Sequence, residues 1–97
     1  YCSISSGVQI YTHDTVKWSL TGGKAEFEKG NVSIGDNCYV GPNVIISKDV
    51  KIGKGCIIGS NSFVNRNIPQ NSIVYGIPGK KVGKVKIVGK KISLEYL

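Results

Sequence analysis

The stretch "IGDNCYVGPNVIISKDVKIGKGCIIGSNSFVN" (residues 34–65) repeats a unit of six residues. An aliphatic residue opens each unit, a small residue usually follows, two mostly polar residues come next, and the fifth position is small or aliphatic. This spacing fits neither the 3.6-residue period of a helix nor the two-residue period of an ordinary strand. Each step of six lands on an aliphatic side chain: Ile34, Val40, Ile46, Ile52, Ile58 and Val64.

A six-residue repeat of this kind is typical of a parallel β-helix. Glycine and small polar residues at the second position suit a chain that bends after every short strand. Strands of successive coils pair at a spacing of about 4.8 Å, so the first and fifth positions would stack into inward columns. The sequence therefore predicts an all-β fold, with residues 1–79 forming the β-helix domain.

The three cysteines all occupy the fifth position of the repeat, as Cys2, Cys38 and Cys56. We expect them to point inward as small apolar fillers. If three repeats make one coil, Cys38 and Cys56 lie on adjacent coils, where a disulfide is not forbidden; reduced packing residues are the favoured interpretation. An odd number of cysteines without CxxC spacing argues against a zinc knuckle or a disulfide framework and indicates a reducing, cytoplasmic setting.

The repeat fails between about residues 14 and 31, "DTVKWSLTGGKAEFEKGN", where Gly22 and Glu28 occupy positions that require an inward aliphatic residue. This segment is predicted to leave the coil as one long loop. Long loops in compact domains are usually functional or disordered. His13, the only histidine, stands at the base of this loop, and Trp18, the only tryptophan, lies within it.

The charge of the chain, formally +7, is concentrated in a basic C-terminal segment, residues 80–97. A solvated or partly disordered tail, a contact with a phosphate-bearing ligand, a nucleic acid and an anionic membrane surface are the alternatives. No aromatic residue is interleaved with the lysines before Tyr96, which argues against nucleic acid. No apolar run approaches the roughly 18 residues that a membrane span requires.

The run from Val32 to Lys80 resembles the C-terminal half of the hexapeptide-repeat acyltransferases, closest to the galactoside, maltose and surface-glycan O-acetyltransferases. Three features carry the resemblance: the repeats, the ending "NIPQNSIVYGIPGK" (residues 67–80), and a histidine that precedes an extruded loop one coil earlier. The resemblance implies a left-handed β-helix with one extruded loop. It also implies a homotrimer with active sites between subunits, and acetyl-CoA as the donor.

The resemblance also implies roles for individual residues. His13 falls at the position of the catalytic histidine, and Tyr39 at that of the aromatic residue beside the pantetheine arm. Pro42, at the coil corner, has no N–H to offer an oxyanion, so Gly41 or another donor would have to serve. The positions implied to bind the coenzyme are Tyr39, Gly41, Ser60, Asn65, Arg66 and Lys80.

The chemistry of acetyl transfer agrees with a histidine at this place. Moving an acetyl group from a thioester to a hydroxyl requires a base of near-neutral pKa, and imidazole is the usual choice. No nucleophile motif is present, which favours direct attack by the acceptor hydroxyl. Asp14 is a candidate for orienting the imidazole, although adjacent residues on an extended segment point to opposite sides. Trp18 either forms a stacking face for the sugar acceptor or anchors the loop.

Three alternatives remain beside O-acetylation of a sugar or surface glycan. An N-acetyltransferase acting on an amino sugar or amino acid would share the fold and the donor. A non-catalytic β-helical binding scaffold would leave His13 incidental. A zinc-dependent carbonic anhydrase on the same fold needs three histidines per metal, which one histidine per chain does not supply, so no metal is expected.

Overall fold

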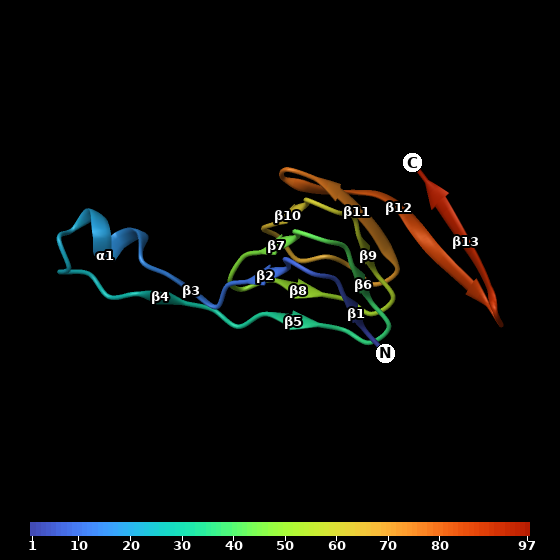
Figure 1. Cartoon of the computed structure of the whole chain (residues 1–97), viewed down its shortest axis with the longest axis horizontal. Coiled ribbons are helices and arrows are strands. Elements are labelled where there is room, and N and C mark those ends of the chain that lie inside the picture. Colours follow the sequence, from blue (N-terminus) through green and yellow to red (C-terminus); the bar gives the residue numbers. More distant parts are fainter.

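The computed structural model describes all residues, 1–97, and its main body is a parallel β-helix (Figure 1). Strands of two residues recur at the repeat spacing and alternate with turns. They are β1 (Ser3–Ile4), β2 (Gln9–Ile10), β5 (Ser33–Ile34), β6 (Tyr39–Val40), β7 (Ile45–Ile46), β8 (Lys51–Ile52), β9 (Ile57–Ile58) and β10 (Phe63–Val64).

These strands build three faces. The first face contains β1, β6 and β9, the second contains β2, β7 and β10, and the third contains β5 and β8 with a bridge from Ile52 to Ile68. Tyr39 pairs with Ile57, so one regular coil takes 18 residues, or three repeats. Ser3 pairs with Tyr39, 36 residues away, because the first coil contains one coil length of extra chain between β2 and β5.

The core consists of the first and fifth positions of the repeat. The first-position side chains from Val40 to Val64 are at most 2% exposed, and so are the fifth-position residues from Cys38 to Ser62. The Cys38 thiol donates to the carbonyl of Gly53 and the Cys56 thiol to that of Pro69, each at 3.2 Å. Burial raises the pKa of the Cys56 thiol. Both thiols therefore fill space in the core as free cysteines and donate hydrogen bonds to backbone carbonyl groups.

The first coil is the open end of this core. Ile4 and Ile10 keep the inward phase but are each 46% exposed, because no coil lies beneath them. The prediction that Cys2 fills the core is wrong, because Cys2 is exposed. Its thiol donates to the Gly35 carbonyl at 3.2 Å, in the same way as the thiols of Cys38 and Cys56 donate to carbonyl groups.

Two positions of the repeat explain how the chain turns. A Cβ on Gly53 would lie 2.5 Å from the backbone nitrogen of Gln70, so the second position has to be small where the next coil packs on it. The fourth position adopts a left-handed backbone, with φ values from 59° to 70° at Asn37, Asn43, Asp49, Gly55 and Asn61. Asparagine, aspartate and glycine are the residues that tolerate this conformation.

Strand β11 (Ser72–Gly76) continues the first face beside β9 and then reverses into β12 (Gly79–Val88). Strand β12 pairs antiparallel with β13 (Lys91–Tyr96), so residues 79–96 form a hairpin that extends beyond the β-helix. Gly89, with a φ of 62°, and Lys90 form its turn. The basic C-terminal segment is thus an ordered pair of strands in the structure.

The excursion from the first coil contains β3 (His13–Asp14), the short helix α1 (Val16–Leu20) and β4 (Glu28–Lys29). Figure 1 shows this loop and the β12–β13 hairpin leaving the β-helix in opposite directions, which makes the molecule elongated, 54 × 23 × 23 Å. No helix of the structure has the length and apolar character that crossing a membrane requires.

Candidate functional site

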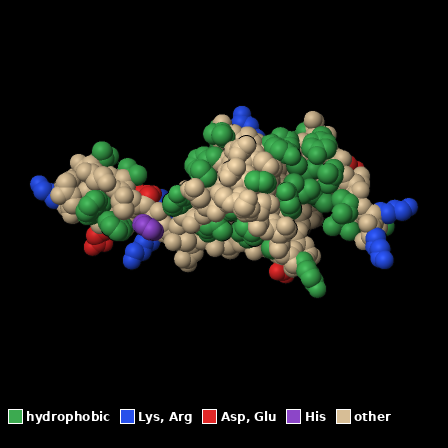
Figure 2. Space-filling view, in the orientation of Figure 1, with side chains coloured by type: hydrophobic (Ala, Val, Ile, Leu, Met, Phe, Trp, Pro, Cys, Tyr) green, Lys and Arg blue, Asp and Glu red, His purple; other side chains and the backbone are tan.

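The base of the excursion is a two-stranded antiparallel ribbon. His13 on β3 pairs with Lys29 on β4, and the Gly30 N–H donates to the Thr12 carbonyl at 2.9 Å. The side chain of His13 is exposed. It is the purple side chain at the neck between the loop and the β-helix in Figure 2. A solvent-accessible imidazole is therefore held on a short ribbon at the edge of the coil.

Asp14 does not orient this imidazole. One carboxylate oxygen accepts the Val16 N–H at 3.1 Å, at the start of α1, and the other lies 3.1 Å from the Lys48 ammonium. These two contacts lower the pKa of Asp14. The Asp14 carboxylate thus accepts a hydrogen bond at the start of α1 and forms an ion pair with Lys48. Adjacent side chains on a strand point to opposite sides, which agrees with Asp14 facing away from the His13 imidazole.

Lys48 ties the ribbon to the second coil. It follows β7 and lies 3.4 Å from Glu28 on β4, in addition to its contact with Asp14 on β3. Glu28 also pairs with Lys17 of α1, and the contacts with Lys17 and then Lys48 lower the pKa of Glu28. One lysine of the regular coil thereby contacts both strands of the irregular excursion.

Three aromatic rings form a column along the excursion. The Phe27 ring stacks on the His13 imidazole, with centroids 6.0 Å apart and planes at 17°. The indole of Trp18 meets Phe27 edge-on, at 5.7 Å and 87°. A Cβ on Gly23 would lie 3.6 Å from the indole nitrogen, so the loop tip packs against Trp18.

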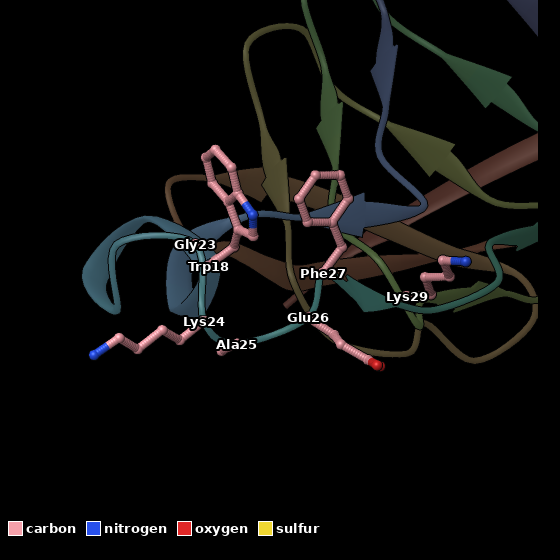
Figure 3. Close-up of a pocket in the computed structure, with 7 residues that line it drawn as sticks. All are labelled: Trp18, Gly23, Lys24, Ala25, Glu26, Phe27 and Lys29. Atoms are coloured by element: carbon pink, nitrogen blue, oxygen red, sulfur yellow. The ribbon is translucent and has the colours of Figure 1, made fainter.

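An open hollow of about 530 Å³ lies beside this column. Figure 3 shows the rings of Trp18 and Phe27 pointing to one side, while the side chains of Lys24 and Glu26 extend to the other. The remaining lining residues are Gly23, Ala25 and Lys29. A hollow with an aromatic wall and charged residues at its margin is the kind of surface on which a sugar ring can stack.

The residues predicted to bind the coenzyme lie at separate places on the β-helix. Tyr39 is on β6 of the first face, 44% exposed. Gly41 and Ser60 stack at the corner between the first and second faces: a Cβ on Gly41 would lie 2.9 Å from the Ser60 nitrogen. The Gly41 N–H donates to the Ile58 carbonyl at 2.9 Å, so it is not free to stabilise an oxyanion.

Asn65 and Arg66 follow β10, at the corner between the second and third faces from which the His13 ribbon also leaves, and both are exposed. Lys80 lies on β12, opposite Tyr75 of β11, and is also exposed. The structure therefore brings Gly41 together with Ser60. The second face separates this pair from His13 within one chain.

Phe27 and Lys48 are the residues that the sequence pattern did not identify. Phe27 lies in the excursion, outside the register of the repeat, so no periodicity marks it. Lys48 occupies a polar position of the repeat, where a lysine carries no signal of its own. No group of three or more histidine, cysteine or acidic side chains lies close enough together to hold a metal ion.

Comparison with known proteins gives the class first. Residues 31–66 match the family described as bacterial transferase hexapeptide, six repeats. Together with the parallel β-helix that the chain shares with its structural neighbours, this match confirms the resemblance to the hexapeptide-repeat transferases over these repeats.

A particular relative is Protein CapG of Staphylococcus aureus, 41% identical over 93 residues, which are 95% of this chain and 54% of CapG. A maltose O-acetyltransferase from Clostridium difficile is 34% identical, with a TM-score of 0.73 over 82% of this chain and 43% of that one. A hexapeptide-repeat acetyltransferase from Vibrio cholerae complexed with acetyl coenzyme A is 26% identical, with a TM-score of 0.72 over 89% of this chain and 50% of that one. The chain thus spans about half the length of the relatives it matches.

Proposed function

We propose that this chain is the donor-binding and catalytic part of an acetyltransferase that moves an acetyl group from acetyl-CoA to a hydroxyl of a sugar or surface glycan. The observation that carries the proposal is the position of His13. The only imidazole of the chain is exposed at the base of the excursion and stacks with Phe27, which lines the hollow together with Trp18. The maltose O-acetyltransferase and the acetyl coenzyme A complex among the structural neighbours support the acceptor class and the donor.

In the proposed reaction His13 acts as a general base. The acceptor hydroxyl gives its proton to the imidazole while its oxygen adds to the thioester carbonyl, forming a tetrahedral oxyanion. The oxyanion collapses, the carbon–sulfur bond breaks, and the leaving thiolate of CoA takes the proton from the imidazolium. A donor other than the Gly41 N–H stabilises the oxyanion. Trp18 provides a stacking face for the acceptor.

The donor is proposed to contact Tyr39, Gly41, Ser60, Asn65, Arg66 and Lys80, with Lys80 near the nucleotide phosphates. Asn65 and Arg66 lie at the corner from which the His13 ribbon leaves, whereas Gly41 and Ser60 lie at a different corner of the same chain. A second copy that brings its own His13 corner against the Gly41–Ser60 corner would complete a site, which supports a homotrimer with active sites between subunits. Three thiols outside any disulfide are compatible with a cytoplasmic setting.

The test is replacement of His13 in the full-length protein. His13→Ala should lower kcat about 10²- to 10⁴-fold, while the KM for acetyl-CoA and the oligomeric state are kept. His13→Asn, which retains size but cannot take a proton at neutral pH, should be nearly as inactive. Near-parent turnover in His13→Ala would exclude the general-base role. A stable monomer in light scattering would exclude the site between subunits.

A further inference from the structure

Phe27 lies between the only histidine and the only tryptophan of the chain. Its ring is 6.0 Å from His13 at 17°, and 5.7 Å from Trp18 at 87°. The three rings come from different segments of the excursion: β3, α1 and the segment that leads into β4. Phe27 is therefore the one side chain of the structure that connects the proposed base to the wall of the proposed acceptor site.

Packing alone holds the imidazole. None of the side-chain hydrogen bonds of the structure involves His13, and the neighbouring carboxylate of Asp14 is engaged by Val16 and Lys48. The near-parallel Phe27 ring, whose centroid lies 6.0 Å from that of the imidazole, packs beside it and restricts its rotation about the Cβ–Cγ bond. Stacking on the face leaves both nitrogens free, because they lie at the edge of the ring and bond in its plane.

Phe27 itself is held on two sides. Trp18 contacts it in a T-shaped arrangement, and Trp18 is supported by the close approach of Gly23, whose N–H donates to the Trp18 carbonyl at 2.7 Å. The next residue in the chain, Glu28, pairs with Lys48 of the second coil. The orientation of Phe27 is thus tied both to the loop helix and to the rigid β-helix.

We propose that Phe27 is a positioning residue: it fixes the plane of the His13 imidazole for proton transfer and couples that plane to Trp18. The inference rests on the proposed general-base role of His13. In many enzymes a hydrogen-bonded carboxylate orients the base; here an aromatic face does so. Catalytic geometry is demanding, since a misplacement of about 1 Å can cost about 10²-fold in rate.

The kinetic test compares Phe27→Leu, which keeps bulk but removes the flat ring, with Phe27→Tyr, which keeps the ring. In the full-length protein Phe27→Leu should lower kcat about 10- to 100-fold with the KM for acetyl-CoA unchanged, and Phe27→Tyr should stay within about two-fold of the parent. Tyr96→Leu, on the distant β13, is the matched control and should have no effect. Parent-like turnover of Phe27→Leu, or an equal loss in Phe27→Tyr, would overturn the proposal.

A spectroscopic test needs no activity. The imidazole C–H signals of His13 are assigned in NMR as those that are missing from His13→Ala, and a ring stacked at 6.0 Å shifts them. The signals should move in Phe27→Leu and stay in Phe27→Tyr, and the fluorescence of the single tryptophan should change with them. Unmoved histidine signals in Phe27→Leu would refute the stacking.

The two proposals fail differently. If His13→Ala keeps near-parent turnover, the general base is wrong, and with it the catalytic role of Phe27. If His13→Ala is inactive while Phe27→Leu turns over normally, the general base stands and only the positioning role is wrong.

Discussion

The stacked coils and the two excursions from them, the His13 loop and the β12–β13 hairpin, are stabilised in different ways. In the coils, repeated positions bury their side chains almost completely, and Ile46 and Ile58 are fully buried. In the His13 loop and the hairpin most large apolar residues remain exposed: Trp18 at 44%, Phe27 at 46% and Ile87 at 58%. Ring contacts, ion pairs and ladder hydrogen bonds hold these segments instead. The regular part is the scaffold, and the proposed chemistry lies where regularity ends.

The largest effect expected from this difference is on stability. Ile46→Ala removes a fully buried side chain from the middle coil and should lower the free energy of unfolding by about 2–5 kcal/mol. Ile87→Ala makes the same chemical change on the exposed hairpin and should cost well under half as much. Urea unfolding followed by far-UV circular dichroism measures both. Equal losses would mean that the hairpin is packed as tightly as the coils.

The next effect concerns donor binding by the hairpin. Lys80→Ala should raise the KM for acetyl-CoA about ten-fold and leave kcat within a few-fold, because a cation near a phosphate gives a charge-assisted contact that is made before the chemical step. Lys90→Ala, at the exposed turn of the same hairpin, is the matched control and should be silent. The opposite result would show that the wrong cations have been assigned to the donor.

Within the coils, the turn conformation should have a smaller effect than the core. Asn43 has a φ of 60°, where a side chain without a local polar group is strained. Asn43→Ala should therefore cost about 1 kcal/mol in the free energy of unfolding, and Asn43→Gly less, since glycine adopts this conformation freely. Thermal unfolding of the pair checks the order. A more stable alanine variant would contradict the assigned backbone strain.

The sequence predicted the coils well because each repeat position has one physical task. Ile46 has to be aliphatic since it faces the core, and Gly53 has to be small since the next coil packs on it. The prediction described the fourth position only as mostly polar. Its asparagine residues were a signal for the left-handed backbone that the structure has there. The hairpin carried a signal too: apolar and polar residues alternate on either side of Gly89 and Lys90.

The candidate site was only partly predictable. A break in the repeat located His13 and Trp18, because an absence of pattern is itself visible in a periodic sequence. The contacts of Phe27 and Lys48 depend on how the excursion folds back, and nothing in the repeat encodes that geometry. The separation of His13 from the Gly41–Ser60 corner likewise follows from the three-sided coil, not from the residue types.

The smallest effect expected is a pH-dependent loosening of the excursion that leaves the coils intact. The folded pKa values of Asp14 and Glu28 are lowered, so their contribution to stability is present above the ordinary carboxyl range, about pH 4, and is lost as the pH falls through the lowered values. The pKa values of Lys17 and Lys48 are raised, so their contribution is lost only as the pH rises beyond about 10.4. Between these limits the ion pairs stay formed.

The single tryptophan reports this loosening, because Lys17 lies beside Trp18 on α1 and pairs with Glu28. Acidification below about pH 4 should change the tryptophan fluorescence while the far-UV circular dichroism of the β-helix stays constant, and added salt should weaken the step because exposed charges are screened. Lys48→Met should reduce the step, since it removes the ion pairs that join these carboxylates to the second coil, while the Lys17–Glu28 pair within the excursion still responds to acid. Lys54→Met, on the same coil but without an ion pair, is the matched control. An acid step of full size in Lys48→Met would show that the rings alone hold the excursion against the β-helix, and that the ion pairs follow its position without fixing it.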